Sequence, residues 1–578
     1  MKESSDQITF FAKTNSRGRE MPFGIKRKDR VRHMYVIGKT GMGKSTLLEN
    51  MAIQDIRNGE GVAFIDPHGA TAERLLEYVP KERVKDVLYF APFDMEHPIA
   101  FNVMEDVGYD KRHLVVSGLL AAFRKIWVDA WSARMEYILS NTLLALLEYP
   151  GSTLLDVNRM LINKNFRKKV VENITDPIVK DFWEQEFATY TDRYTQEATP
   201  AIQNKVGQFT SNPLIRNIVG QPKSSFDIRK IMDERKILII NLSKGRVGEV
   251  NATLLGSMLV TKIYLAAMSR ADASIQVMEG LPSFYFYVDE FQTFANQSFA
   301  DILSEARKYK LNLIIAHQYV EQMEEEVRDA VFGNVGTTIA FRVGPFDAEV
   351  LETIFKPQFS ATDLVNLGFA QVYLTLMIDG VGSPPFSATT LPPFDLPGER
   401  YPREVMESSR GLFSKPRGMV EEAIKKWNES DPPSALVPKP RKDYVRHDAP
   451  KAPPTSVAPT PPTTPILHKP AEIKHAEAKV MGEQIAREHK MAQSQGAEPL
   501  RHSPYNPPFD RTQGKPPLDG IQSLREALER IKKAPATDLK ETLNKIAPEA
   551  REPDTHKSVG LPEKVLREML AVDEENIS

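Results

Sequence analysis

A glycine-rich loop, set between a short apolar run and a helical one, constrains the fold of this chain more than any other feature. Residues 35–46 read Tyr-Val-Ile-Gly-Lys-Thr-Gly-Met-Gly-Lys-Ser-Thr and match the pattern G-x-x-x-x-G-K-[ST]. Backbone N–H groups in such a loop wrap a phosphate, and glycine lets the backbone come close enough to do so. A strand, this loop and a helix through about Asn58 therefore predict an α/β fold that binds a nucleoside triphosphate.

The residues of this loop have distinct expected roles. Lys44 is expected to reach the β- and γ-phosphates, and the Ser45 hydroxyl is expected to bind Mg²⁺. The cofactors predicted from the loop are therefore ATP and Mg²⁺. The residues expected to contact the nucleotide are Gly38, Thr40, Gly41, Gly43, Lys44, Ser45 and Thr46.

An acidic pair ends a second apolar run. Residues 284–288 are Phe-Tyr-Phe-Tyr-Val, and Asp289 and Glu290 follow directly. Asp289 is expected to hold Mg²⁺, directly or through water, and Glu290 to polarise the attacking water. Adjacent acids also occur on ordinary surfaces, but a glycine-rich phosphate loop in the same sheet favours a catalytic pair. The pair favours hydrolysis coupled to motion over the chemistry of a small-metabolite kinase.

Three more residues are candidates for the same site. Gln318 lies at the tip of the predicted strand 311–316, two residues beyond it, where a glutamine can sense the γ-phosphate and relay its hydrolysis. We interpret the adjacent His317 as a structural neighbour. Arg307 is expected to enter the site of a neighbouring subunit as a catalytic arginine, the alternative being an ordinary solvated side chain. Arg342 is a second candidate for such a role in cis or in trans. An arginine that acts in trans requires a ring of subunits.

The run Asp66-Pro-His-Gly at the end of strand 61–66 also lies where ligands bind in such folds. Asp66 could support the water shell of Mg²⁺, or it could cap the following helix. His68 has only Asp66 close to it, and no cysteine or second histidine completes a ligand set. We therefore expect no metal site at His68.

The composition is that of an ordinary globular protein, with 41% apolar and 26% charged residues in 578, and no cysteine. Two folded domains plus extensions are expected at this length, and the lack of cysteine excludes disulfides and thiolate metal sites. The N-terminus lacks the apolar segment of a secretory signal. The longest apolar run, 254–268, is expected to be too short to span a bilayer. We therefore expect a cytoplasmic protein without a transmembrane segment.

The segment before the glycine-rich loop is basic. Residues 1–33 hold nine Lys and Arg against four Asp and Glu. We interpret residues 1–30 as a basic N-terminal arm and expect a solvated, disordered leader. Contact with a nucleic-acid phosphate backbone is the alternative.

Alternating strands and helices lie on both sides of a long helical segment. The alternation predicts an α/β domain with a mostly parallel sheet covered on both faces. Helical periodicity, as in residues 135–147, predicts an all-helical insertion within that domain. The expected strands are 35–37, 61–66, 87–90, 236–241, 283–288, 311–316, 336–342 and 371–376. The expected divisions are the arm (1–30), the first part of the core (31–108), the insertion (109–226), the second part of the core (227–400), a helical extension packed on the core (401–430) and a tail (431–578).

The tail differs in composition from the rest of the chain. Residues 431–470 contain twelve prolines, which is typical of a semi-rigid linker. Weak helices at 471–494, 520–533 and 562–571 are too short to be stable alone. We interpret the tail as disordered, with helical motifs that fold on a partner; an inert, solubilising tail is the alternative.

Together these segments resemble the HerA/FtsK superfamily of ring-forming, RecA-like DNA-pumping ATPases. Within it the chain is similar, over about residues 25–400, to the coupling proteins of conjugative type IV secretion systems, the TraD/TraG-like family. The run Asp-Pro-His-Gly is similar to HerA-like helicases, and the helical insertion is similar to coupling proteins. The segments that carry the resemblance are Gly38–Thr46, Ile65–Gly69, Pro98–Asn102, Val288–Phe291, Arg307 and Ala316–Gln318.

The resemblance implies a RecA-like P-loop NTPase domain that assembles as a hexameric ring and drives DNA through its central channel by ATP hydrolysis. The helical insertion would guard the side at which DNA enters. The implied partners are DNA and secretion-system or relaxase-type proteins, the latter bound through the insertion and the tail. Coupling proteins usually carry N-terminal transmembrane helices; here we expect attachment to the inner membrane only through partners.

The leading interpretation is therefore a DNA-translocating ATPase of a type IV secretion system. The alternatives are a cytosolic HerA-like helicase or translocase, and a secretion-system ATPase that acts on protein. A third alternative is a non-enzymatic adaptor that binds ATP and recruits cargo through the tail. The intact set of Lys44, Asp289 and Glu290 argues against the adaptor, which has no need of a hydrolytic glutamate.

Overall fold

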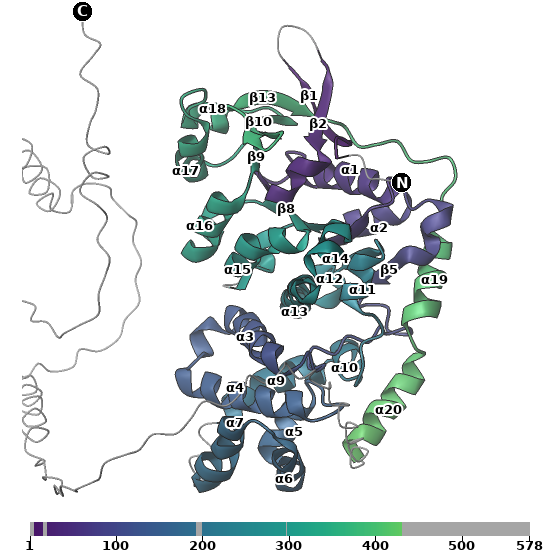
Figure 1. Ribbon diagram of the computed structural model, residues 1–578, viewed down its shortest axis with the longest axis vertical. Helices are drawn as coiled ribbons and strands as arrows, with labels where there is room; N and C mark the ends of the chain where they lie inside the picture. Colours follow the sequence, from purple (N-terminus) through teal and green to yellow (C-terminus); the bar gives the residue numbers. More distant parts are fainter. Residues whose placement is uncertain (1–4, 16–19, 192–198, 296–297, 430–578) are drawn as a thin grey trace, which may run out of the picture. The chain divides into compact units, whose positions relative to one another are not determined.

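The computed structural model describes residues 5–15, 20–191, 199–295 and 298–429. The linker and tail predicted for residues 431–578 lie outside them. The described strands form an eleven-stranded sheet and a two-stranded ribbon (Figure 1). The strands are β1 (Ile8–Thr14), β2 (Pro22–Lys26), β3 (Met34–Ile37), β4 (Gly61–Asp66), β5 (Val87–Phe90), β6 (Ile237–Asn241), β7 (Phe284–Val288), β8 (Leu311–His317), β9 (Thr337–Ala340), β10 (Gln371–Thr375), β11 (Met377–Ile378), β12 (Val381–Gly382) and β13 (Phe386–Thr390).

Helices connect most of these strands. They are α1 (Lys44–Arg57), α2 (Ala70–Leu76), α3 (Tyr109–Ile126), α4 (Ala133–Glu148), α5 (Asp156–Ile162), α6 (Lys164–Asn173), α7 (Pro177–Asp181), α9 (Pro200–Ser211), α10 (Pro213–Val219), α11 (Ile228–Asp233), α12 (Lys244–Val247), α13 (Glu249–Met268), α14 (Ile275–Gly280), α15 (Ser298–Glu305), α16 (Glu325–Asn334), α17 (Pro345–Phe355), α18 (Ala361–Val365), α19 (Pro402–Phe413) and α20 (Arg417–Glu429).

The large sheet has a parallel block and an antiparallel extension. Its order is β2-β1-β13-β10-β9-β3-β8-β7-β4-β6-β5. The seven strands from β9 to β5 run parallel, and the other four continue the sheet antiparallel. The prediction of a mostly parallel sheet is confirmed. The strand that leads into the glycine-rich loop, β3, lies between β9 and β8.

Both faces of the sheet are covered by apolar side chains, because successive residues of a strand point to opposite faces. In β4, Val62 and Phe64 belong to a core that also contains side chains of α1 and α2. Ala63 and Ile65 belong to a second core with side chains of α13, α15 and α16. Burial on both faces explains why the parallel strands are continuous apolar runs in the sequence.

Between β5 and β6 the described residues contain helices and no strand. Helices α3 to α9 gather on one side of the sheet, below it in the view of Figure 1. We call α3 to α10 the helical region. Helix α3 packs closely on α13, since a Cβ at Gly118 would overlap the side chain of Thr261. The helical region is therefore joined to the sheet's own covering helix.

The N-terminal segment is not the solvated, disordered leader that its charge predicts. Its described part forms β1 and β2, and β1 pairs with β13. The reason is that cations among its described residues, such as Lys28 and Arg30, have partners within the fold. Arg30 is 2% exposed; it donates to Asp55 at 2.6 and 2.8 Å and lies 3.7 Å from the centre of the Tyr285 ring. A paired, bidentate guanidinium of this kind can be buried, whereas a free one cannot.

The apolar run 254–268 belongs to a longer helix than the sequence indicated. Helix α13 begins at Glu249, and the stretch 249–272 is long and apolar enough to cross a membrane by length and composition. The prediction that this run is too short was therefore wrong. Of its most apolar 18-residue window, 72% is buried inside the fold. Packing against the sheet and α3 accounts for the apolar character of α13 as a core helix.

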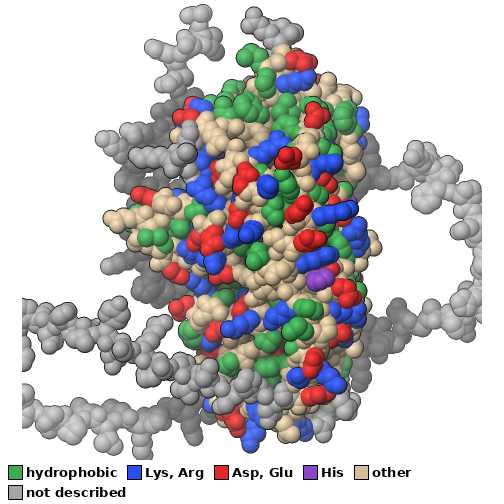
Figure 2. All heavy atoms as spheres, turned by 90° about the vertical axis from the view of Figure 1, so that its right-hand side faces the viewer, with side chains coloured by type: hydrophobic (Ala, Val, Ile, Leu, Met, Phe, Trp, Pro, Cys, Tyr) green, Lys and Arg blue, Asp and Glu red, His purple; other side chains and the backbone are tan. Residues whose placement is uncertain are grey.

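The last two described helices pack on separate parts of the molecule. In α19, the Ser409 hydroxyl accepts a hydrogen bond of 2.9 Å from the backbone N–H of Tyr89 in β5. In α20, the indole N–H of Trp427 lies 3.1 Å from both carboxylate oxygens of Asp156 in α5. The face that carries α19 and α20 shows Lys and Arg interspersed with Asp and Glu (Figure 2). Among the described residues visible in this view, the face offers no extended basic surface.

Candidate functional site

The glycine-rich loop runs from the carboxyl end of β3 to the start of α1. Gly41 and Gly43 have φ angles of +77° and +112°, which residues with a side chain rarely adopt. A Cβ at Gly38 would lie 2.5 Å from Phe341 Cβ, so a larger residue does not fit there. The first N–H groups of a helix lack intrahelical acceptors. The loop and the helix start thus form a backbone cradle suited to a phosphate.

Lys44 lies in the first turn of α1 and is turned back over the loop. It is 7% exposed, and its Nζ donates to Gly38 O at 2.6 Å and to Lys39 O at 3.1 Å. Burial lowers the pKa of Lys44, and the nearby carboxylates of Asp289 and Glu290 oppose this shift. The ammonium group therefore lies in the cradle, where a phosphate oxygen could replace the loop carbonyls as its partner.

The two residues predicted to hold Mg²⁺ lie side by side. The Ser45 hydroxyl donates to Asp289 Oδ2 at 2.7 Å, although 244 residues separate the two in sequence. Asp289 is 3% exposed, and burial raises the pKa of its carboxyl group while the bond from Ser45 opposes the shift. A hydroxyl and a carboxylate are oxygen ligands of the kind that Mg²⁺ prefers. Thr46, the next loop residue, lies in the first turn of α1.

Glu290 is joined to the glycine-rich loop by a chain of hydrogen bonds. The Thr40 hydroxyl donates to Gln318 Oε1 at 3.1 Å, and Gln318 Nε2 donates to Glu290 Oε1 at 2.7 Å. Glu290 itself has a φ of +46°, an uncommon conformation for a residue with a side chain. The structure thus brings together Thr40, Gln318 and Glu290, three residues singled out separately from the sequence.

Two contacts of Glu290 were missed by sequence reasoning. His68 Nε2 lies 2.7 Å from Glu290 Oε1, and Lys244 Nζ lies 3.3 Å from Glu290 Oε2. His68 follows β4 and Lys244 follows β6, so both lie at the same edge of the sheet as Glu290 after β7. Their position directly after a predicted strand was the available signal. In the sequence, His68 was considered only as a metal ligand.

Asp66 caps the start of helix α2, and its charge also acts on Asp289. Its Oδ1 accepts a hydrogen bond of 2.8 Å from His68 N, and its Oδ2 accepts one of 2.9 Å from Ala72 N in α2. Of the two roles left open by the sequence, the geometry favours the cap. In the part of the chain that the structure describes, no group of three or more His, Asp or Glu side chains could hold a metal ion.

The two candidate arginines lie at opposite ends of the parallel strands. Arg307 is exposed in the turn 306–309, just before the amino end of β8, and its charge helps to lower the pKa of His33. Arg342 lies beyond the carboxyl end of β9, where its carbonyl accepts a hydrogen bond of 2.8 Å from Lys39 N. The structure therefore places Arg342 beside the glycine-rich loop, and it does not bring Arg307 to that loop.

His317 is the last residue of β8, and its contacts are structural. It is 0% exposed, and its Nδ1 lies 3.2 Å from the Tyr35 hydroxyl. Burial lowers the pKa of His317 to about 3, with smaller contributions from the charges of Lys44 and Lys125. The imidazole is therefore neutral at pH 7, which agrees with its interpretation as a structural neighbour.

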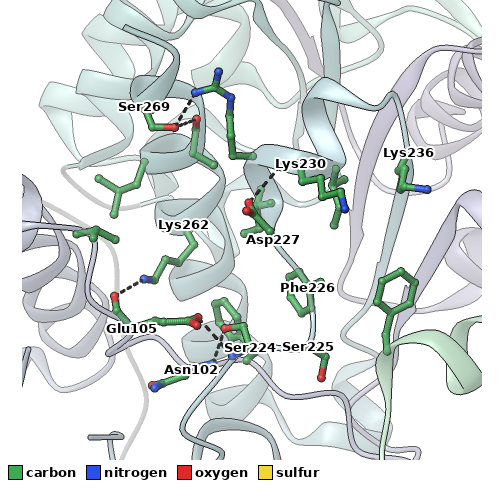
Figure 3. A pocket seen from close by; sticks show the side chains of 18 of the residues that line it. Asn102, Glu105, Ser224, Ser225, Phe226, Asp227, Lys230, Lys236, Lys262 and Ser269 are labelled. Atoms are coloured by element: carbon green, nitrogen blue, oxygen red, sulfur yellow. Dashed lines mark hydrogen bonds between the residues drawn. The ribbon is translucent and has the colours of Figure 1, made fainter. Parts of the chain in front are cut away.

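A cavity of about 910 Å³ lies away from this site, between α11, α13 and the segment before α3 (Figure 3). Lys262 lines it and donates a long hydrogen bond of 3.4 Å to Glu105 O. Burial lowers the pKa of Lys262 to about 8. Other cations at the cavity have acidic partners, such as Lys111 with Asp272 at 2.7 Å. The balanced charge of its lining does not select a class of ligand.

A comparison with protein families matches residues 20–352 to the type IV secretion-system coupling protein DNA-binding domain. The matched residues contain the glycine-rich loop, Asp289, Glu290 and Gln318. The resemblance stated from the sequence motifs is thereby confirmed. A comparison with the sequences of curated proteins gives no match.

Comparison with one solved structure, at a TM-score of 0.50, agrees on the fold. The unbound monoclinic form of the bacterial conjugative coupling protein TrwBΔN70 has a TM-score of 0.50 and 15% identity, covering 66% of this chain and 89% of that one. TrwB in complex with ADP and Mg²⁺ has a TM-score of 0.49 and 14% identity, with coverage of 69% and 98%. VirB4 of Thermoanaerobacter pseudethanolicus has a TM-score of 0.46 and 13% identity, with coverage of 69% and 98%.

Proposed function

Because the chain belongs to the family of type IV secretion-system coupling protein DNA-binding domains, we propose that it is an ATP-hydrolysing motor that moves DNA for such a system. The hydrogen-bond chain from Thr40 through Gln318 to Glu290 carries the proposal. It connects the loop that would hold the γ-phosphate to the acid that would activate water. A protein that only bound nucleotide would have no use for this connection.

The nucleotide would lie against the cradle of residues 38–44. Ser45 and Asp289 would hold Mg²⁺, which supplies positive charge to the phosphates and orients them when it is bound. Lys44 would exchange its hydrogen bonds to the loop carbonyls for bonds to phosphate oxygens. Each of these groups is already within hydrogen-bond distance of another member of the site.

Glu290 would orient the attacking water and accept its proton. Its carboxylate contacts Gln318, Lys244 and His68, so its direction is fixed by side chains from three neighbouring strand ends. Gln318 also contacts Thr40, so a change at the γ-phosphate could be transmitted to Glu290 through a single side chain. This arrangement supports Gln318 as the sensor proposed from the sequence.

A hexameric ring is part of the proposal. Arg307 lies at the sheet edge opposite its own glycine-rich loop, so a role in hydrolysis would place it in the site of a neighbouring subunit. A catalytic arginine in trans couples hydrolysis in one subunit to the position of the next. The helical region and the residues beyond 430 are proposed as the surfaces that bind relaxase-type or other secretion-system proteins.

The proposal is tested by the ATPase rate of the full chain, measured with and without single- and double-stranded DNA at two salt concentrations. The expected result is stimulation by DNA that weakens as salt rises, because contacts with the phosphate backbone depend on salt. Glu290→Gln supplies the matched control, which should bind DNA without hydrolysis. An ATPase rate that no DNA alters would contradict the proposal and favour a motor that acts on protein.

A further inference from the structure

The segment that follows Glu290 is held by two helices outside the nucleotide site. Residues 291–295 form a tight turn in which Thr293 N donates to Glu290 O at 2.8 Å and Ala295 N donates to Phe291 O at 2.9 Å. This turn begins directly at Glu290, whose positive φ must be held by its surroundings. No role for this segment followed from the sequence motifs.

The first helix that holds the turn is α3, through Lys125 in its last turn. Its Nζ donates to Gln292 O at 2.6 Å and also to Ala295 O. Lys125 thus reaches from the helical region to both ends of the turn. Burial lowers the pKa of Lys125 to about 8, and Glu324 is the acid that opposes this shift. A buried lysine that donates hydrogen bonds to two backbone carbonyls restrains the conformation of that backbone.

The second helix that holds the turn is α13, which packs against another side of it. A Cβ at Gly256 would overlap the ring of Phe294, which is completely buried. The Ser257 hydroxyl donates to Phe294 O at 3.3 Å. The lack of a side chain at Gly256 therefore leaves the space that the Phe294 ring occupies.

The two helices that hold the turn also pack against each other. Helices α3 and α13 approach closely where Gly118 faces Thr261, because a Cβ at Gly118 would overlap that side chain. Close-packed elements tend to shift together and do not deform independently. A displacement of α3 relative to the sheet would therefore act on residues 291–295, and through them on Glu290.

We propose that Lys125 is a positioning residue through which the helical region sets the position of Glu290. The inference rests on the proposed ATPase function and adds a route of control to it. Whatever shifts α3 would change the rate of the chemical step without touching the nucleotide. The residues that hold ATP would be unaffected, since Lys125 contacts none of them.

The test compares Lys125→Met with Lys125→Arg in the full chain. Arg124→Met is the matched control, because Arg124 is the adjacent residue of α3 and pairs with Glu136 instead of with the turn. Lys125→Met should lower kcat on the order of 10-fold or more, since small misplacements of catalytic groups are costly. ATP affinity should change by less than about 2-fold, because uniform binding is untouched. Lys125→Arg should recover much of kcat.

A second measurement separates this inference from the ATPase proposal. Hydrogen exchange of the backbone amides of residues 290–295 should be faster in Lys125→Met than in the native chain, and near native in Lys125→Arg and Arg124→Met. If the native chain hydrolyses no ATP, faster exchange still supports the positioning role while the ATPase proposal fails. Unchanged exchange in Lys125→Met overturns the inference, whatever happens to kcat.

Gly256→Ala tests the same arrangement from α13 if Lys125→Met does not fold. Its new methyl group would displace Phe294, so kcat should fall while ATP affinity is retained. A native kcat in a folded Gly256→Ala or Lys125→Met protein would overturn the inference.

Discussion

Gln318 donates a hydrogen bond of 2.7 Å to Glu290, and the two lie at the ends of adjacent parallel strands, β8 and β7. The same Gln318 accepts a hydrogen bond from Thr40. One amide side chain therefore contacts both the loop that would bind phosphate and the acid that would activate water.

Replacing Gln318 by alanine should slow hydrolysis while nucleotide binding is retained. Glu290 would lose the donor that orients it, so kcat should fall on the order of 10²-fold. Gln322→Ala is the control, because Gln322 is an exposed glutamine four residues further along. Steady-state ATPase assays and the affinity for a fluorescent ATP analogue separate the two effects. Equal loss in both variants would contradict the role of Gln318.

Lys44→Ala should weaken ATP binding about 10- to 100-fold, since a hydrogen bond to a charged group contributes about 1.5–3 kcal/mol. The fold should survive, because the partners of Lys44 in the structure are backbone carbonyls of the same loop. Titration calorimetry with MgATP measures the affinity, and Lys308→Ala, at an exposed lysine paired with Glu305, supplies the control. Native affinity in Lys44→Ala would show that the phosphates bind elsewhere.

Arg307→Ala should leave ATP binding intact and lower turnover on the order of 10³-fold, if this arginine acts in a neighbouring subunit. Mixing Arg307→Ala with Lys44→Ala subunits should restore part of the activity. Such mixtures contain intact sites of the first variant that face intact arginines of the second. A normal turnover in Arg307→Ala, or no recovery on mixing, would remove Arg307 from the mechanism.

Two buried histidines should make the fold less stable in mild acid. Burial is the main cause that lowers the pKa of His33 to about 4 and that of His317 to about 3, whereas the value in an unfolded chain is about 6.5. The unfolded chain then binds more protons between these values, so the free energy of unfolding falls as the pH drops below about 6.5. Each histidine contributes about 1.4 kcal/mol per pH unit in that range.

Urea unfolding between pH 7 and 5 measures this loss. His317→Gln keeps a polar group near Tyr35 and removes one titration, so its stability should fall less steeply with acid than that of the native chain. Identical slopes in the two proteins would contradict the shifted pKa of His317. The carboxyl groups are common to both proteins and cancel in the comparison.

Buried parallel strands were predictable because they are uninterrupted apolar runs. The strands 61–66 and 87–90 have the bounds expected from the sequence. The antiparallel strands β1, β2 and β13 were missed, since they are partly exposed and pair over long distances, as β1 does with β13. Local patterns do not contain such pairings.

The candidate site follows the same division. The glycine-rich loop contains Lys44 and Ser45, and the acidic pair is Asp289 and Glu290. Each motif is local in sequence, so their meeting could be predicted once the two motifs were assigned to strands of one sheet. His68 and Lys125 reach Glu290 or its turn only through the order of the strands and the docking of α3. The place of His68 after a predicted strand was a signal for the site, whereas nothing around Lys125 in the sequence indicates its contact.

Release of streptavidin from the biotinylated ends of single- and double-stranded DNA tests the central claim most directly. The native chain should displace streptavidin from at least one of these DNAs in the presence of MgATP. Glu290→Gln should bind the same DNA and displace none. A native protein that hydrolyses ATP and leaves streptavidin on every DNA would contradict the account of this chain as a DNA motor.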